Sequence, residues 1–205
     1  MPDMTSGETA EIGPDSPSDR SAADGGRERR PVTRTFLELT ALEQLREGKP
    51  PALPATLEWI DPCLTPRWRA LYRQIGAPWH WHDRDAWEDH RLDAHLARSD
   101  VRVFRVAAAA PTNTPAPADA GFLELEKHAD GSVEIAYIGL DRAWLGHGLG
   151  AWLVTQAVRT AFAWGATRVW LHTCTLDAPA ALPNYLARGF IITGDEVYFT
   201  TIAEP

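Results

Sequence analysis

The chain has 205 residues, which is enough for one domain with a substantial hydrophobic core. Its 28 acidic and 20 basic residues give a formal net charge of −8, which argues against a nucleic-acid or anionic-membrane surface, because such surfaces need a basic patch. The two cysteines, Cys63 and Cys174, follow no C-x-x-C pattern, and the sequence contains no secretory leader and no apolar run of membrane-spanning length. We therefore expect a cytoplasmic protein with reduced cysteines, and neither a membrane nor a nucleic acid as its partner.

Residues 1–32 are rich in Pro, Asp, Glu, Ser, Gly and Arg and contain almost no large apolar side chains. Such a segment cannot bury enough surface to offset the entropy lost on ordering it. We predict a disordered N-terminal tail over residues 1–32, followed by a single domain over residues 33–205. A docking arm is the alternative for the tail, but nothing in it alternates or repeats.

The first half of the domain is expected to begin with a strand at 33–39, a helical turn at 41–46 and a Pro-rich extended connector at 49–54. Residues 65–76 predict a helix, because Thr65 stands at the N-terminal cap position, Pro66 follows at the first helical position and Gly76 marks the end. A second helix is expected at 83–98. The apolar face of the first helix has helical spacing and comprises Trp68, Leu71, Tyr72 and Ile75.

The segment 77–87, at the junction of these helices, is unusually rich in Trp and His. His80 and His82 beside Asp83 allow a metal site, but no third His or Cys stands at ligand spacing. The tryptophans are expected either to pack under the second helix or to line a substrate pocket, because large aromatic side chains can do both.

The second half predicts three strands in an antiparallel meander, followed by two helix–strand units. The helix between the third and fourth strands should make these two strands parallel through a right-handed crossover. A closing hairpin turns at Gly194-Asp195. The expected ranges are strands 101–107, 121–126 and 133–140, helix 147–164, strand 168–173, helix 179–188 and hairpin strands 190–193 and 197–200.

A glycine-rich stretch follows the third strand of the meander, with Gly146, Gly148 and Gly150 at its centre. Glycines allow the backbone to approach a ligand closely, and the N–H groups at the start of the following helix attract phosphate. A Walker loop is excluded because no Lys follows Gly150. A dinucleotide fingerprint is matched by Gly146, Gly148 and Ala151, but no acidic residue for a ribose ends the next strand. A turn without a ligand is the remaining alternative.

Residues 134–154, together with the stretch Tyr185-Leu186-Ala187-Arg188-Gly189-Phe190, resemble the GCN5-related N-acetyltransferase (GNAT) superfamily. The shared pattern is a strand, the motif [QR]-x-x-G-x-[GA], a helix, another strand and a helix that carries Y-x-x-x-G-F. Leu145 departs from the polar residue that usually precedes the glycines. The resemblance implies an α+β GNAT fold with a mixed, mostly antiparallel sheet, a splayed parallel strand pair and about four helices. It divides the domain into acceptor-side helices at about 65–98, an acetyl-CoA core at about 101–190 and the closing hairpin at 190–201.

The same resemblance implies where the chemistry lies. Tyr185 corresponds to the Tyr that protonates the leaving thiolate, and Glu134 stands where some members carry a catalytic base. Glu124, Glu126, His147 and His172 compete for the role of the base. No metal is needed. The residues expected to hold acetyl-CoA are Ile138, Gly139, Leu140, Leu145, Gly146, His147, Gly148, Leu149, Gly150, Ala151 and Asp177.

The predicted function is therefore acetyl-CoA-dependent transfer of an acetyl group to a primary amine of a small molecule, peptide or protein, by direct attack in a ternary complex. The expected partners are acetyl-CoA and the amine acceptor, with a homodimer as one option for the assembly. A non-catalytic acyl-CoA-binding or sensor protein of the same fold is the alternative. A nucleotide-dependent oxidoreductase is disfavoured by the single β-α-β crossover.

Overall fold

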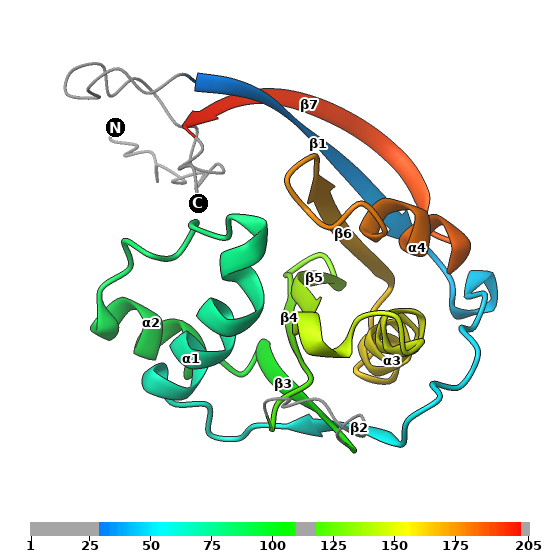
Figure 1. Ribbon diagram of the computed structural model, residues 1–205, viewed down its shortest axis with the longest axis horizontal. Helices are drawn as coiled ribbons and strands as arrows, with labels where there is room; N and C mark the ends of the chain where they lie inside the picture. The colour runs from blue at the N-terminus through cyan, green and yellow to red at the C-terminus, as the bar shows by residue number, and fades with distance from the viewer. Residues whose placement is uncertain (1–28, 110–117, 202–205) are drawn as a thin grey trace, which may run out of the picture.

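A computed structural model describes residues 29–109 and 118–201 of the chain. Seven strands form one sheet in the order β2-β3-β4-β5-β6-β1-β7, with α1 and α2 on one face and α3 on the other (Figure 1). The strands are β1 (Arg29–Leu39), β2 (Ala55–Trp59), β3 (Val101–Ala108), β4 (Gly121–Lys127), β5 (Ser132–Leu140), β6 (Arg168–Cys174) and β7 (Ile191–Thr201). The α-helices are α1 (Thr65–Gly76), α2 (Asp89–Leu96), α3 (Leu149–Ala163) and α4 (Ala181–Ala187), with short 3-10 turns at Leu42–Gln44, Ala77–Trp79 and Arg142–Trp144.

The meander of β3, β4 and β5 is antiparallel, as the alternating sequence predicts. Strand β2 extends it at the outer edge, where Ala55 pairs with Ala108 and Trp59 with Phe104. The sequence analysis did not identify β2, because this five-residue strand is half-exposed and follows a Pro-rich connector without a clear alternation.

Strands β5 and β6 are parallel, which confirms the predicted crossover. They pair only at Ser132 with Arg168, Val133 with Val169 and Glu134 with Trp170. Beyond Glu134 the two strands separate, so the carboxyl-terminal halves of β5 and β6 leave an opening in the sheet.

A bulge in β5 accompanies this opening. Glu124 pairs with Tyr137 and Leu125 pairs with Ile135, so Ala136 is the extra residue. As a result Ile135 packs in the hydrophobic cluster under α3, whereas Tyr137 packs against α1 on the opposite face. Without the bulge, residues two positions apart would point to the same face.

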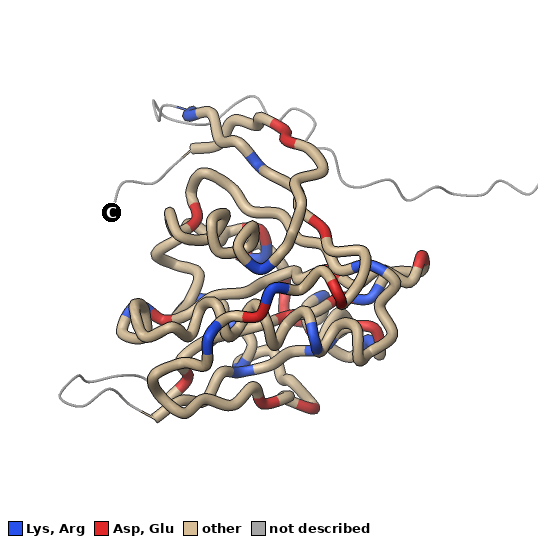
Figure 2. The backbone as a smooth tube through the Cα atoms, turned by 90° about the vertical axis from the view of Figure 1, so that its right-hand side faces the viewer, with Lys and Arg blue, Asp and Glu red and all other residues tan. Residues whose placement is uncertain are grey.

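Two hydrophobic clusters hold the layers together. Leu149, Leu153, Ala157 and Ala161 lie at helical spacing and form the buried stripe of α3 against the sheet. Helix α1 buries the predicted residues Trp68, Leu71, Tyr72 and Ile75 against β3, β4 and β5 on the other face. Among the described residues, no helix has the length and apolarity to cross a membrane. Figure 2 shows acidic and basic residues interspersed along the described chain.

The predicted closing hairpin is wrong. Residues 191–201 form a single strand, β7, which pairs along its length with β1, from Glu38 opposite Ile191 to Arg29 opposite Thr201 (Figure 1). Gly194 lies opposite Phe36 beside a register shift and not in a turn, and the Thr35 hydroxyl donates to the Asp195 carboxylate at 2.5 Å. Because β1 supplies a neighbouring strand, the segment does not have to pair with itself.

This pairing also moves the start of the domain. Residues 29–32, which we assigned to the disordered tail, form the first part of β1, and Val32 is buried. The rest of the predicted tail, residues 1–28, lies outside the described residues, as does most of the loop predicted at 109–119. A run of Arg-Arg-Pro contains no apolar pattern of its own, so only its pairing with β7 reveals the strand.

Details at the N-terminal ends of α1, α2 and α3 also differ from the predictions. Helix α2 begins at Asp89 and not at residue 83, because Arg84 turns its side chain into the protein interior instead of continuing a helical surface. Helix α3 begins at Leu149, where Gly148 is left-handed with a φ of 79°. The Thr65 side chain does not cap α1, because its hydroxyl donates to Asp93 at 2.6 Å.

Candidate functional site: a cavity where two parallel strands separate

A cavity of about 670 Å³ occupies the opening between β5 and β6. One side of its lining, which we call the glycine-loop wall, is contiguous in sequence; the other, which we call the composite wall, comes from β1, β6, β7 and the segment after α1. The turn at 176–181 and helix α4 complete the lining with Asn184 and Tyr185. The glycine-loop wall comprises Ile138, Gly139, Leu140, Leu145, Gly146, Gly148, Gly150 and Ala151, and the composite wall comprises Arg34, Trp79, His80, Trp81, Asp83, His172, Cys174 and Tyr198.

The glycine-loop wall has the backbone geometry of an anion-binding turn. Gly146 and Gly148 have φ values of 82° and 79°, a region that side chains with a Cβ rarely adopt. The following N–H groups belong to the first turn of α3, which has no partner within the helix for them. Asn184 of α4 donates to the carbonyl oxygen of Gly150 at 3.1 Å and so ties α4 to this turn.

Of the residues predicted to hold a cofactor here, His147 and Leu149 do not line the cavity. The Leu149 side chain is fully buried in the core beneath α3, and the His147 carbonyl accepts a hydrogen bond from the N–H of Ala52. For these two positions only the backbone can contribute to the wall.

The edge of β5 continues this wall. The N–H of Asp141 donates to Ala120 at the β4 side, and alternate residues of a strand direct their backbone groups to opposite neighbours. Ile138 and Leu140 therefore direct their backbone groups towards the opening. Gly139 serves packing as well, because a Cβ there would lie 2.5 Å from Ile75 of α1.

Tyr185 lies on α4, lines the cavity and is only 7% exposed. Its ring meets that of Phe190 edge-on, with the ring centroids 6.1 Å apart. Burial, with a smaller contribution from the negative charge of Asp177, raises the pKa of the Tyr185 phenol well above its usual value. The hydroxyl is therefore protonated at neutral pH and can donate a proton.

Asp177 lines the cavity, but its carboxylate already has partners within the chain. One of its oxygens, Oδ2, accepts hydrogen bonds from the Thr173 hydroxyl at 2.6 Å and from the N–H of Cys174 at 2.9 Å. These bonds close the turn after β6. The structure thus gives Asp177 a structural task in addition to its place on the lining.

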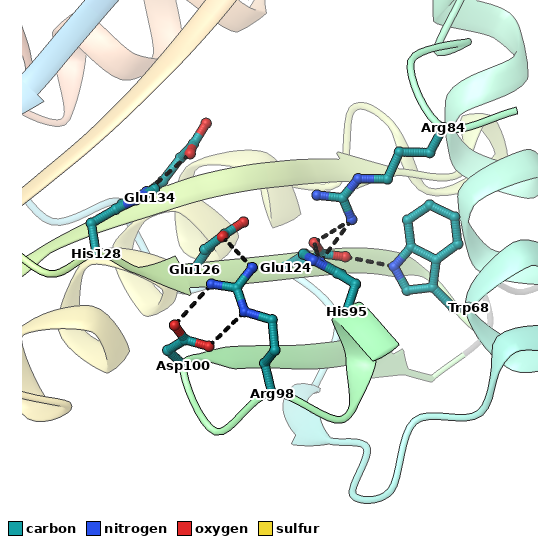
Figure 3. Close-up of polar contacts among 9 residues, drawn as sticks. All are labelled: Trp68, Arg84, His95, Arg98, Asp100, Glu124, Glu126, His128 and Glu134. Atoms are coloured by element: carbon teal, nitrogen blue, oxygen red, sulfur yellow. Dashed lines mark hydrogen bonds and ion pairs between the residues drawn. The ribbon is translucent and has the colours of Figure 1, made fainter. Parts of the chain in front are cut away.

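Glu134 does not line the cavity. It stands at the last paired position of β5 and β6, and its carboxylate lies 3.2 Å from the His128 imidazole (Figure 3). The hydrogen bond to Glu134 raises the pKa of His128. The other two carboxylates that compete for the role of the base also have surroundings of their own. Glu126 forms an ion pair with Arg98 at 2.8 Å, and Glu124 is fully buried. Glu134 thus stands where β5 and β6 are still paired, and its role as the base stays a prediction.

Glu124 is the centre of a buried cluster that supports the composite wall (Figure 3). One carboxylate oxygen accepts hydrogen bonds from Arg84 at 2.6 Å and lies 3.0 Å from His95, and the other accepts one from the Trp68 indole at 2.5 Å. Burial opposes the charged form, but the hydrogen bond with His95 and the charge of Arg84 outweigh it and lower the pKa of Glu124. The cluster therefore joins β4, α1, α2 and the segment that carries Asp83.

The composite wall contains three residues that the sequence analysis did not place in the site, namely Arg34, Cys174 and Tyr198. The Trp-rich segment lines the cavity through Trp79 and Trp81, and Trp81 also packs on Gly76 and against Tyr137, with the ring centroids 5.1 Å apart. The tryptophans thus pack in the interior and line the cavity, and their contact with a substrate stays a prediction. The guanidinium carbon of Arg34 lies over the Tyr198 ring, 4.9 Å from its centroid. Their positions depend on the pairing of β1 with β6 and β7, which no local motif reveals.

His172 lies on β6 beyond the point where β5 and β6 separate, with its side chain exposed to the cavity. The surrounding protein desolvates the ring, and the nearby charge of Arg34 acts in the same direction, so the pKa of His172 is lowered. The imidazole is therefore neutral at pH 7 and able to accept a proton. Among the described residues, no three His, Cys, Asp or Glu side chains are grouped to hold a metal ion, and His82 pairs with Asp85 at 2.7 Å.

Comparisons with known proteins agree with this architecture. The family model described as Acetyltransferase (GNAT) family matches residues 53–190. A GCN5-related N-acetyltransferase from Sphaerobacter thermophilus has a TM-score of 0.60 at 18% identity, over 83% of this chain and 52% of that chain. A GCN5-related N-acetyltransferase from Kribbella flavida has a TM-score of 0.55 at 20% identity, over 84% of this chain and 59% of that one. This chain thus spans a little over half the length of these two proteins.

A third structure is closer in length. An aminoglycoside acetyltransferase from an uncultured soil metagenomic sample has a TM-score of 0.51 at 18% identity, over 65% of this chain and 86% of that chain. At such identities the structural matches establish the fold alone. No curated protein matches the sequence. The family model, however, spans the glycine loop, the separating strands and Tyr185, and by that match the chain belongs to the acetyltransferase (GNAT) family.

Proposed function

We propose that this protein is an acetyl-CoA-dependent N-acetyltransferase that acetylates a primary amine by direct attack in a ternary complex. The observation that carries the proposal is the separation of β5 from β6 directly beside the glycine loop that begins α3. This arrangement offers phosphate-binding N–H groups and an unpaired strand edge in one cavity. Acetyl-CoA, when bound, supplies the activated acetyl thioester.

The glycine-loop wall fits this co-substrate. The N–H groups that follow Gly146 and Gly148 would hold its phosphates, because glycine has no side chain that keeps a ligand away from the backbone. The backbone groups of Ile138 and Leu140 would pair with the amide-bearing arm in the manner of an added strand. Leu145, 45% exposed on the cavity lining, offers an apolar surface where the family usually has a polar side chain.

Two side chains are suited to move the protons. His172 is neutral and would take the proton that the attacking amine releases. Tyr185 is protonated and would donate to the leaving sulfur as the C–S bond breaks. A backbone N–H of β5 at the opening would stabilise the developing oxyanion, an effect typically worth about 3 kcal/mol for each donor. We place His172 in the role first considered for Glu134, because His172 lines the cavity and Glu134 does not.

The test is calorimetric titration of the full chain with acetyl-CoA, with NADH as the control ligand, followed by thiol-release assays over a panel of amines. Saturable binding of acetyl-CoA alone, with thiol release that depends on an amine, is the expected result. Binding without release by any amine would favour the acyl-CoA-binding or sensor alternative. Failure to bind acetyl-CoA at sub-millimolar concentration would refute the proposal.

A further inference from the structure

Asp83 differs from every other charged residue on the cavity lining. Its carboxylate is exposed to the cavity, and within residues 29–109 and 118–201 it has neither a hydrogen-bond partner nor an ion-pair partner. Arg34 is paired with Glu196 at 2.7 Å, and Asp177 accepts two hydrogen bonds from its own turn. Among the charged side chains on the described lining, Asp83 is therefore the one that has no polar partner within the described part of the chain.

The position of Asp83 is fixed by its neighbours on both sides. The next residue, Arg84, is 8% exposed and is bonded to Glu124 at 2.6 Å (Figure 3). Two residues earlier, Trp81 is packed on Gly76 and against Tyr72, with the ring centroids 5.8 Å apart. A carboxylate held between two anchored residues loses little conformational freedom when it binds a ligand.

The surroundings of Asp83 suit an ammonium group. Trp79 and Trp81 line the same cavity, and aromatic faces attract cations. The charge of Asp83 also acts on His172, whose pKa it raises against the larger lowering effects. A cation bound by Asp83 therefore lies within electrostatic reach of the group that would accept its proton.

We propose that Asp83 binds the ammonium group of the acceptor and that the enzyme accordingly selects amines without a neighbouring carboxylate. This inference rests on the proposed acetyltransferase function. An α-amino acid would bring a second anion beside Asp83, while the only Arg on the described lining is already neutralised by Glu196. An amine with an apolar body would instead meet the aromatic rings of the composite wall.

The experiment compares tyramine with tyrosine, which have the same ring and differ in the carboxylate. Binding of each to the full chain in the presence of CoA is measured by calorimetry, and kcat/KM is measured by thiol release with acetyl-CoA. The variant is Asp83→Asn, and Asp85→Asn is the matched control, because Asp85 pairs with His82 and does not line the cavity. Thermal unfolding of both variants checks that they fold.

The wild-type protein should prefer tyramine over tyrosine by about tenfold or more in both binding and kcat/KM, as one charge interaction of this size gives. Asp83→Asn should remove most of that preference by raising KM for tyramine, with acetyl-CoA affinity unchanged, and Asp85→Asn should retain it. Equal binding of the two ligands by the wild type, no binding of either, or an unchanged preference in Asp83→Asn would overturn the inference. The calorimetric measurement needs no turnover. A protein that binds tyramine in preference to tyrosine but releases no thiol would therefore support the role of Asp83 and count against the acetyltransferase function alone.

Discussion

The two walls of the cavity are built in different ways. The glycine-loop wall comes from residues 138–151, one continuous stretch that runs from β5 into α3. The composite wall combines β1, β6, β7 and the segment after α1, so residues as distant as Arg34 and Tyr198 meet in it. The family match over residues 53–190 includes the whole glycine-loop wall and excludes only those parts of the composite wall that β1 and β7 supply.

The two walls should therefore respond differently to substitution. Backbone groups and glycines make the glycine-loop wall, so it depends little on neighbouring side chains. The composite wall depends on the buried Glu124 cluster and on strand register. Variants that damage one wall should leave the other nearly intact, and the following predictions test that separation.

The largest effect is expected from Glu124→Ala, which leaves Arg84 buried without a counter-charge. Breaking a buried ion pair in this way typically costs about 3–5 kcal/mol, so the free energy of unfolding measured with urea should fall by that amount. Glu126→Ala is the matched control. Its partner Arg98 keeps Asp100 at 2.8 Å, so we expect a loss below about 1 kcal/mol. Equal losses in the two variants would contradict the supporting role of the cluster.

Tyr185→Phe should slow the chemical step without weakening ligand binding at either wall. Loss of the proton donor should lower kcat by about a hundredfold, because general acids contribute about 10²–10⁴-fold. The dissociation constant of acetyl-CoA should stay within about twofold, since the ring and its packing on Phe190 remain. Stopped-flow thiol release and calorimetry give the two quantities. A parallel loss of affinity and rate would assign Tyr185 to binding instead.

Gly148→Val should damage the glycine-loop wall alone. A side chain at a φ of 79° is strained, and the loop would have to change its conformation to relieve that strain. We expect the dissociation constant of acetyl-CoA to rise by about tenfold, which corresponds to about 1.4 kcal/mol, with KM for the amine little changed. Gly194→Ala, where a Cβ meets nothing and φ is not positive, should behave as the wild type. If both variants bind normally, the loop geometry is not what holds the phosphates.

The smallest effect is a change in the pH profile of kcat/KM for the amine. The pKa of His172 is lowered by burial and by Arg34, while Glu134, Asp83 and Asp177 oppose this effect. Only the neutral ring accepts a proton, so its contribution should be complete above pH 6.5 and decline as the pH falls through the lowered pKa.

The control for this profile is the same amine assayed with variants of the two candidate bases. His172→Gln should lower kcat/KM and remove the additional acidic decline, whereas Glu134→Gln should retain it. The acceptor amine titrates identically in assays of the wild type and of both variants, so its effect cancels when kcat/KM of each variant is divided by that of the wild type at the same pH. An acidic decline that disappears in Glu134→Gln and persists in His172→Gln would return the role of the base to Glu134.

The sequence alone determined the elements that depend on local patterns. The buried faces of α1 and α3 follow helical spacing, and the parallel β5–β6 crossover follows from one intervening helix. Nearly all the residues predicted for the glycine-loop wall do line the cavity, because glycines at 146, 148 and 150 and the following helix lie within a few residues of one another.

Only the tertiary structure decided the composite wall and the strand partners. Residues 191–201 read as a hairpin because Gly-Asp is a good turn signal, but β1 arrives from more than 150 residues earlier and pairs with the whole segment. Likewise, the sequence analysis named Glu134 as the base and gave His172 only as a competitor. The point where β5 and β6 separate puts His172 on the cavity lining and leaves Glu134 off it, and that point depends on contacts among strands that no short window of sequence contains.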